Sequence, residues 1–430
     1  MHASDRQPHH EKSRELQRTL YRAAKRSRTR RFHALYDRVF RPDILWRAWE
    51  EVRANRGEAG IDGTTIEDIE RAGIQDYLQE IATALKENRY RPKPVRRVYI
   101  PKSDGRKRPL GIPTIRDRIV QQACRIVIEP IFEADFEDCS HGFRPKRSAQ
   151  KAAHKVQSLL VRGWYVVDAD IEGFFDNIDH AQLLDLVGRR ISDRRVTKLI
   201  RQWLQTGVVD EGRYHPTDKG TPQGGVISPL LANIYLHLLD RFWVEKGAGK
   251  GSLVRYADDF VVVCRYEQQA REALRQISAV LEGMKLRLHP EKTRIVAAAT
   301  EGFDFLGFNY HKWHSARNGK LFPFMRPNNK AMKHVQASIK EWTSHKRPSV
   351  PMDFIVRHVN SIIVGWRNYF SIGNSYSQFH KLDRYVFDRL RRFYLRRKGR
   401  QPRKHTRFKE WWPECGIERF CLKGICNYAL

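Results

Sequence analysis

The spacing of apolar residues predicts helices along most of this 430-residue chain, with a few short strands between them. Apolar side chains recur three and four positions apart in residues 74–85, 149–160 and 267–284, the pattern of helices that bury one face. Residues 115–136 form a longer run, predicted to be a helix interrupted near Pro130.

β-Branched and aromatic residues gather in short runs that predict strands. One run covers residues 164–171, a second covers 253–254 and a third covers 260–263. The last two are so close in sequence that we expect paired strands joined by a tight turn.

From about residue 328 the strand pattern disappears. Three helical runs follow, at 329–344, 352–370 and 377–397. We therefore expect an α+β domain, with helices packed on a small antiparallel sheet, followed by an all-α module.

Two adjacent acids, Asp258 and Asp259, lie in the predicted hairpin turn. Turn chemistry alone explains such a pair, because Asp tolerates the backbone angles of tight turns. Far upstream, however, Asp168 and Asp170 end another predicted strand, and a solvated strand end is the alternative there. If the acids converge, they repel one another and stay ionised only beside cations. Oxygen ligands with few histidines select Mg²⁺ or Mn²⁺, and two such ions are suited to in-line phosphoryl transfer.

Several blocks in order resemble the group II intron-encoded reverse transcriptases that carry a maturase domain. The blocks are Ile100-Pro101-Lys102, Arg108-Pro109-Leu110-Gly111-Ile112-Pro113, His141-Gly142-Phe143-Arg144-Pro145, Asp170-Ile171 with Phe175, Gly220-Thr221-Pro222-Gln223-Gly224-Gly225, Tyr256-Ala257-Asp258-Asp259, His289-Pro290-Glu291-Lys292-Thr293, Phe305-Leu306-Gly307-Phe308 and Gly365-Trp366-Arg367-Asn368-Tyr369-Phe370.

The resemblance implies a right-hand polymerase fold with fingers and palm, a small antiparallel palm sheet, and an all-α thumb and maturase domain. We expect a basic N-terminal extension and the start of the fingers at 1–90, and fingers and palm at 91–320. The helical domain is expected at 321–400, with a basic tail and no endonuclease domain at 401–430.

The resemblance also assigns the catalytic acids. It makes Asp170 and Asp258 ligands of two Mg²⁺ ions, for which Mn²⁺ is a possible substitute, and it adds the carbonyl of Ile171. Asp259 completes the catalytic carboxylates. Asp168 is the competing candidate, since it lies on the same strand face as Asp170.

The family pattern assigns four further residues to the incoming dNTP. Lys102 and Arg108 flank a turn and would clamp the triphosphate, with plain surface charge as the alternative. Phe175 would lie under the sugar and disfavour a ribose, although a core phenylalanine is the alternative. Gln223 would lie near the incoming base pair.

Looser assignments concern contacts with template, primer or RNA. They are Arg144 for the template, Lys292 for the primer side or the pocket, and Trp366 with Arg367 for the maturase surface. Trp366 is equally consistent with a core position.

Charge points to the class of partner. The chain has 80 Lys and Arg against 49 Asp and Glu, a net charge of +31. Such an excess attracts polyanions, and no apolar run approaches the length that crosses a bilayer. None of the six cysteines forms a Cys-x-x-Cys pair. The N-terminal residues contain acids and no apolar signal segment. We therefore expect a reducing, cytoplasmic location, and the resemblance implies a nucleoid-associated bacterial ribonucleoprotein.

The resemblance implies an RNA-directed DNA polymerase that binds group II intron RNA, assists its splicing and copies it into DNA during retrohoming. The expected partners are intron RNA, an RNA template with a DNA primer, target DNA and dNTPs, with no membrane; the sequence leaves the oligomeric state open. Two alternatives remain: a reverse transcriptase of this lineage recruited to DNA repair or defence, and a splicing factor that chiefly binds RNA.

Overall fold

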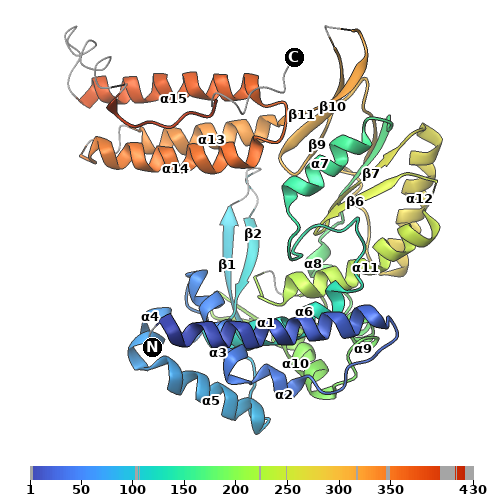
Figure 1. The fold of residues 1–430 in the computed structure, drawn as a ribbon, viewed down its shortest axis with the longest axis vertical. Coiled ribbons are helices and arrows are strands. Elements are labelled where there is room, and N and C mark those ends of the chain that lie inside the picture. The colour runs from blue at the N-terminus through green and yellow to red at the C-terminus, as the bar shows by residue number, and fades with distance from the viewer. Residues whose placement is uncertain are drawn as a thin grey trace.

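The computed structural model describes residues 3–101, 105, 107–221, 224–247, 249–315, 318–344, 349–397, 412 and 414–421, and describes side chains from His10 onward. The elements form an open hand, with helices α1–α5 at its base, the strands β6 and β7 on one side and helices α13–α15 at the top (Figure 1). This arrangement confirms the predicted α+β polymerase fold with an all-α domain after it.

The helices have the following bounds: α1 Ala3–Arg26, α2 Tyr36–Val39, α3 Pro42–Ala54, α4 Ile66–Ala72, α5 Ile74–Lys86, α6 Ile115–Glu133, α7 Ala149–Leu159, α8 Phe174–Asn177, α9 His180–Gly188, α10 Arg194–Gln205, α11 Ser228–Lys246, α12 Glu267–Gly283, α13 Asn329–Trp342, α14 Met352–Phe370 and α15 Tyr376–Arg397. The strands have these: β1 Val95–Pro101, β2 Lys107–Ile112, β3 Tyr165–Ala169, β4 Val208–Asp210, β5 Arg213–His215, β6 Ser252–Tyr256, β7 Asp259–Cys264, β8 Arg294–Ala297, β9 Phe303–Phe305, β10 Phe308–His314 and β11 Leu321–Pro327.

The palm sheet has the order β6-β7-β3-β8, and all its neighbours are antiparallel. Alternate residues of each strand face opposite sides. Val167, Phe260 and Val262 belong to the core shared with the base of the hand, whereas Val166 and Val261 belong to a second core shared with the helical domain. The sheet therefore joins the two hydrophobic cores.

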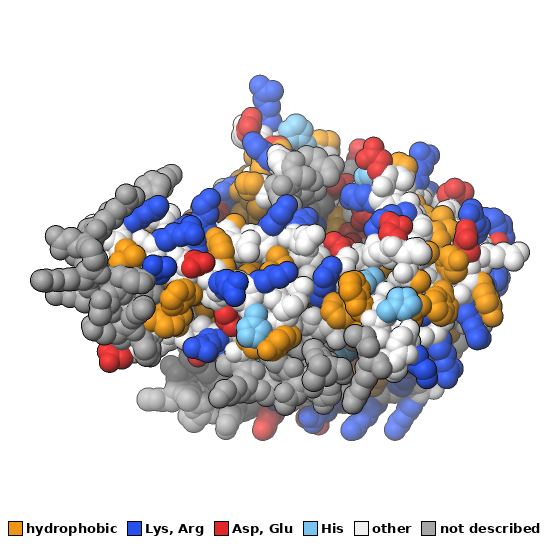
Figure 2. Space-filling model, turned by 90° about the horizontal axis from the view of Figure 1, so that it is seen from above, with side chains coloured by type: hydrophobic (Ala, Val, Ile, Leu, Met, Phe, Trp, Pro, Cys, Tyr) orange, Lys and Arg blue, Asp and Glu red, His pale blue; other side chains and the backbone are white. Residues whose placement is uncertain are grey.

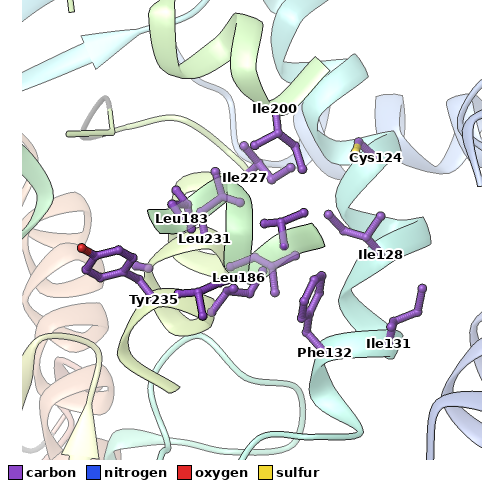
Figure 3. Close-up of a cluster of buried hydrophobic side chains, with 14 of the residues drawn as sticks. Cys124, Ile128, Ile131, Phe132, Leu183, Leu186, Ile200, Ile227, Leu231 and Tyr235 are labelled. Atoms are coloured by element: carbon purple, nitrogen blue, oxygen red, sulfur yellow. The ribbon is translucent and has the colours of Figure 1, made fainter. Parts of the chain in front are cut away.

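Four helices form the centre of the first core (Figure 3). Cys124, Ile128 and Phe132 of α6 face side chains of α9, α10 and α11 in this cluster. Helix α6 is buried over most of its surface and contains Pro130 near its C-terminal end, so the predicted interruption is a proline inside a continuous helix.

The fingers also contain a mixed sheet of order β2-β1-β4-β5. Strands β1 and β2 form an antiparallel hairpin, and β1 pairs with β4 in parallel. Strands β1 and β2 lie on either side of the turn that the sequence predicts between Lys102 and Arg108.

Helix α1 lies within the predicted basic N-terminal extension. Residues 3–26 are helical, and Leu16, Leu20 and Ala24 are buried in the core beside α3 and α6. The basic N-terminal extension is therefore a packed helix over these residues.

The predicted helical domain begins later than expected. Strand β11 pairs with β10 as far as Pro327, so residues 321–327 belong to a sheet and the first helix of the domain starts at Asn329. The predicted tail also contains a packed segment, because Phe420 is fully buried against α14 and α15. Hydrophobic burial of this ring outweighs the basic character of the surrounding sequence.

Within the described ranges, no helix combines the length and the apolar character needed to cross a bilayer. Lys and Arg side chains are spread over the face seen from above, across the helical domain and the palm side (Figure 2).

Candidate active site

The hairpin β6–β7 carries the two adjacent acids at its tip. Tyr256 pairs with Asp259, which leaves Ala257 and Asp258 as the turn. Ala257 has φ +57°, the left-handed conformation that tight hairpin turns require at their first central residue. The predicted hairpin is confirmed.

Strand register brings the distant acid of β3 to this turn. Ala169 pairs with Phe260 in the antiparallel β3–β7 ladder. The next position along both strands sets Asp170 opposite Asp259, directly beside the Asp258 turn. The three aspartates assigned by resemblance therefore meet at one edge of the palm sheet.

Asp168 lies deeper on the same face. It pairs across the strands with Arg294 of β8, and the Arg294 Nε lies 3.5 Å from the Asp168 Oδ2. Burial raises the pKa of Asp168 to about 6, against the opposing effect of Arg294. Asp168 thus has a protein partner and lies two residues further along the chain from the turn than Asp170 does.

Crowding of negative charge is evident at the turn. Burial raises the pKa of Asp259 to about 6, and the charges of Asp258, Asp170 and Asp168 add to that shift. Burial and the charge of Asp170 also raise the pKa of Asp258. Surface exposure of Asp259 is nonetheless appreciable, so its ionised form remains reachable by solvent and by cations.

These carboxylates suit a hard divalent cation in donor chemistry. Among the described residues, no group of three or more His, Cys, Asp or Glu side chains is already arranged to bind a metal ion. The Nζ of Lys292 forms an ion pair with Asp170 Oδ2 instead, at 50% side-chain exposure of the lysine. A cation at this edge would replace the ammonium as the partner of Asp170 and relieve the repulsion that raises the neighbouring pKa values.

The backbone of Ile171 adds an oxygen. Ile171 and Leu288 form an antiparallel bridge whose hydrogen bonds run from the Glu172 N–H to the Arg287 carbonyl, at 2.9 Å, and from the His289 N–H to the Asp170 carbonyl, at 2.8 Å. Neighbouring residues of a strand direct their backbone groups to opposite sides. The Ile171 carbonyl is therefore directed away from Leu288, toward the side of the strand where β7 lies.

The acids open onto a hollow shared with the helical domain. The cavity has a volume of about 750 Å³, and its lining includes Asp170, Asp259 and Lys292 from the palm with Lys330 and Trp366 from the helices. An acidic edge thus faces a wall that carries positive charge, as a nucleic-acid cleft requires.

The structure describes two of the four residues that we expect to contact the dNTP. Arg108 is exposed on β2 and lies close enough to Asp258 for its charge to lower the pKa of that acid. Phe175 is half-buried in α8, edge-to-face with Phe174 at a centroid distance of 5.1 Å. Lys102 and Gln223 lie outside the described residues.

Two of the expected RNA contacts are buried arginines with protein partners. Arg144 forms an ion pair with Glu133 and donates to the carbonyls of Glu137 and Ser140. Arg367 forms an ion pair with Glu418 at 3.0 Å. Both guanidinium groups make contacts within the protein, and their contact with RNA stays a prediction.

Trp366 is half-buried, with rings of Phe370 and Phe420 against it and an edge on the shared hollow. Both sequence alternatives, core and surface, therefore describe part of its position.

Sequence reasoning missed a buried arginine. Arg255 of β6 is fully buried and contacts Asp240 of α11 and the carbonyl of Ala257. A signal was present, because a charged residue interrupts the apolar run Leu253-Val254 immediately before the acidic turn.

Comparison with protein families gives matches over both parts of the hand. Residues 100–310 match the model described as reverse transcriptase (RNA-dependent DNA polymerase), and residues 332–412 match the group II intron, maturase-specific domain. "Protein YkfC" of Escherichia coli (strain K12) is 37% identical over 332 residues, covering 68% of this chain and 87% of that protein. The chain belongs to the group II intron reverse transcriptase and maturase family.

Other relatives of this family member are longer proteins. "Group II intron-encoded protein LtrA" of Lactococcus lactis subsp. cremoris is 44% identical over 215 residues, which cover 50% of this chain and 36% of that protein. "Uncharacterized 91 kDa protein in cob intron" of Schizosaccharomyces pombe is 30% identical over 414 residues, covering 80% of this chain and 51% of that protein. The chain thus matches about a third to a half of the length of these two relatives.

Proposed function

We propose that this protein is an RNA-directed DNA polymerase that acts through two divalent cations, Mg²⁺ or Mn²⁺. The observation that carries the proposal is the strand register that sets Asp170 opposite Asp259, beside Asp258. The match to the reverse transcriptase model over residues 100–310 supports the same reaction class.

Asp170, Asp258 and the carbonyl of Ile171 would hold the cations. Bound there, the ions lower the pKa of the primer 3′-hydroxyl and neutralise charge on the leaving pyrophosphate. Asp259 keeps the negative charge of the edge high. Lys292, which pairs with Asp170 in this structure, would move to a phosphate or to the primer side.

Other residues would orient the nucleotide. Arg108 projects from the fingers hairpin near Asp258, where a guanidinium can grip phosphate oxygens. Lys102 and Gln223 are proposed for the triphosphate and the base pair on sequence grounds. Phe175, packed against Phe174, would form the floor beneath the sugar and collide with a ribose 2′-hydroxyl.

We further propose that the helical domain binds group II intron RNA and assists its splicing. The match of residues 332–412 to the maturase-specific domain and the net charge of +31 support this. Copying of the intron at a DNA target would follow from the two activities together. No observation on the fold or among these relatives favours a role in DNA repair or defence.

The test is primer extension on an RNA template with Mg²⁺ and dNTPs. Asp258→Ala is expected to lower the rate by about a thousandfold or more, since it removes a group that stabilises the transition state. Glu172→Ala, a change of equal charge at an exposed neighbouring position, is the control and should retain synthesis. Full synthesis by folded Asp258→Ala protein would refute the proposal.

Splicing provides a second, separable readout. The same Asp258→Ala protein should still stimulate splicing of its intron RNA, because the acid lies outside the helical domain. A wild-type protein that splices but never extends a primer would instead support the alternative of a splicing factor.

A further inference from the structure

Arg255 carries a charge into the interior of the palm. The side chains of Arg255 and Asp240 are both 0% exposed, and the Arg255 Nε donates to Asp240 Oδ1 at 2.7 Å, with a second bond from Nη2 to Oδ2. Burying two charges is costly even when they are paired. The guanidinium of Arg255 also has donors beyond those that bond Asp240, and these donors have partners near the candidate active site.

The remaining donors of Arg255 reach three different segments. Nη1 donates to Asn233 Oδ1 at 3.1 Å and to the Ala257 carbonyl at 2.8 Å, and Nη2 donates to Ser140 Oγ at 2.7 Å. A planar guanidinium with several bonded donors has little freedom to move. It therefore links helix α11 and the segment 139–142 (the 140 loop) to the hairpin turn.

The contact with Ala257 is the informative one. Its carbonyl belongs to the peptide that joins Ala257 to Asp258, and Ala257 has φ +57°, a conformation that L side chains rarely adopt. The bond from Arg255 fixes the plane of that peptide. The direction in which the Asp258 side chain leaves the backbone is thereby set.

The 140 loop also packs against the backbone of β6 and of the turn. Arg255 N–H donates to the Cys139 carbonyl and His141 N–H donates to the Arg255 carbonyl, both at 2.8 Å. A Cβ on Gly142 would lie 2.3 Å from the Ala257 nitrogen, so only glycine fits there. The Asn233 amide donates to the Gly142 carbonyl at 2.8 Å, which ties this loop to the same network.

We propose that Arg255, held by Asp240, Asn233 and Ser140, is a positioning residue that sets the Asp258 carboxylate where it meets the cation. The inference rests on the proposed polymerase function, since it concerns the same acid. It also gives the His141-Gly142 block a role in supporting the turn that carries Asp258, separate from any contact with template.

Two variants test the proposal. Arg255→Lys keeps a charge for Asp240 but cannot hold Asn233, Ser140 and Ala257 at once. The double variant Arg255→Met/Asp240→Leu removes both charges and so leaves no unpaired ion in the core.

The matched control is Arg190→Met/Asp135→Leu. These residues form another poorly exposed ion pair, at 3.0 Å, whose arginine bonds to the segment after α1 and not to the hairpin. A loss of stability alone should therefore affect the control and the test variants alike.

The readouts separate positioning from folding. We expect kcat for single-nucleotide extension to fall about a hundredfold in the test variants, since small misplacements cost that much, while the KM for dNTP and the affinity for template-primer change by less than about twofold. Mn²⁺ binding is measured by electron paramagnetic resonance in a complex with a dideoxy-terminated primer and dNTP, where no reaction occurs. Its affinity should fall by about tenfold in the test variants and stay unchanged in the control.

Wild-type kcat and Mn²⁺ affinity in folded Arg255 variants would overturn the proposal, as would losses that match those of the control. If both Arg255 variants fail to fold, Ser140→Ala takes the same measurements, with a smaller loss of kcat expected and wild-type values contradicting the proposal. An inactive wild-type protein would defeat the proposed polymerase function, whereas the Mn²⁺ measurement would still judge the positioning role.

Discussion

At the scale of residues, the packing of Phe175 suits the role in sugar selection that we propose for it. Its ring is half-buried and rests edge-to-face on Phe174, which is itself buried in the first core. A ring held in this way cannot swing aside at small cost, so it can act as a fixed floor for the sugar.

Replacing Phe175 tests this role. We expect Phe175→Ala to increase incorporation of ribonucleotides relative to deoxyribonucleotides by about tenfold or more, because the clash with the 2′-hydroxyl disappears. The measurement is the ratio of kcat/KM for a matched NTP and dNTP on one RNA template. Phe174→Leu serves as a control for general loosening, and unchanged sugar selectivity in Phe175→Ala would remove the assignment.

The carboxylates make a prediction about pH. Burial and the neighbouring acids raise the pKa of Asp259 to about 6, above its value in an unfolded chain. Without a cation, the folded protein therefore loses stability as pH rises from about 4 to 6. Asp259→Asn should raise the unfolding midpoint at pH 7.5 but not below about pH 3, where the acid is protonated in both states.

Cation binding should show the opposite trend. Ligation needs ionised carboxylates, so the Mg²⁺ concentration that protects the wild-type protein from thermal unfolding should fall as pH rises from about 5.5 to 7.5. A Mg²⁺ response that is flat over this range would contradict a site built on these acids.

At the scale of elements, the sequence predicted the parts with strong local patterns. The hairpin of residues 252–264 and the three C-terminal helices agree with their apolar spacing, with ends that differ by a few residues. The sequence did not predict strand β11, because its run Leu321–Pro327 contains two prolines, which are typical of strand edges and not of strand centres.

The candidate site was predictable only in part. The resemblance assigned the acids, including Asp170 in preference to Asp168. Their meeting at the turn depends on the register of β3 and β7, which no local pattern encodes. The role of Arg255 depended on contacts with α11 and the 140 loop, and no local pattern encodes such contacts between distant segments.

The segment 414–421 gives a prediction for an element outside regular structure. Phe420 is fully buried between Trp366 and Phe379, and the Asp383 carboxylate accepts from the Phe420 and Cys421 N–H groups. Phe420→Ala should destabilise the helical domain by about 3–5 kcal/mol, the usual range for removal of a buried ring.

Urea unfolding followed by tryptophan fluorescence measures this change. Tyr376→Ala removes an aromatic ring that is 43% exposed on the same domain, and it should cost less than about 1 kcal/mol. Equal stability of wild type and Phe420→Ala would show that this segment does not pack as described.

At the scale of the whole molecule, charge and cavity act together. The net charge of +31 surrounds a hollow whose palm edge is acidic and whose helical wall includes Lys330. Under the proposed function, the basic surroundings would bind the phosphate backbone, while the acids at the edge would bind the cations.

Binding of RNA should therefore weaken steeply with salt. Each neutralised phosphate contributes a slope of about −0.7 for single strands or −0.9 for duplexes in log K against log salt, so a contact with several phosphates gives a large total. Filter binding or fluorescence anisotropy between about 50 and 200 mM salt measures it. A nearly flat response would contradict an interface dominated by phosphates.

The most direct measurement compares two aspartates on one strand face. Single-nucleotide extension on an RNA template should fall by about a thousandfold or more in Asp170→Asn, with template-primer affinity unchanged, because a cation ligand is lost. Asp168→Asn, which leaves Arg294 its second partner Glu301, should stay within about tenfold of wild type. Full extension by folded Asp170→Asn protein, or a greater loss in Asp168→Asn, would contradict the account.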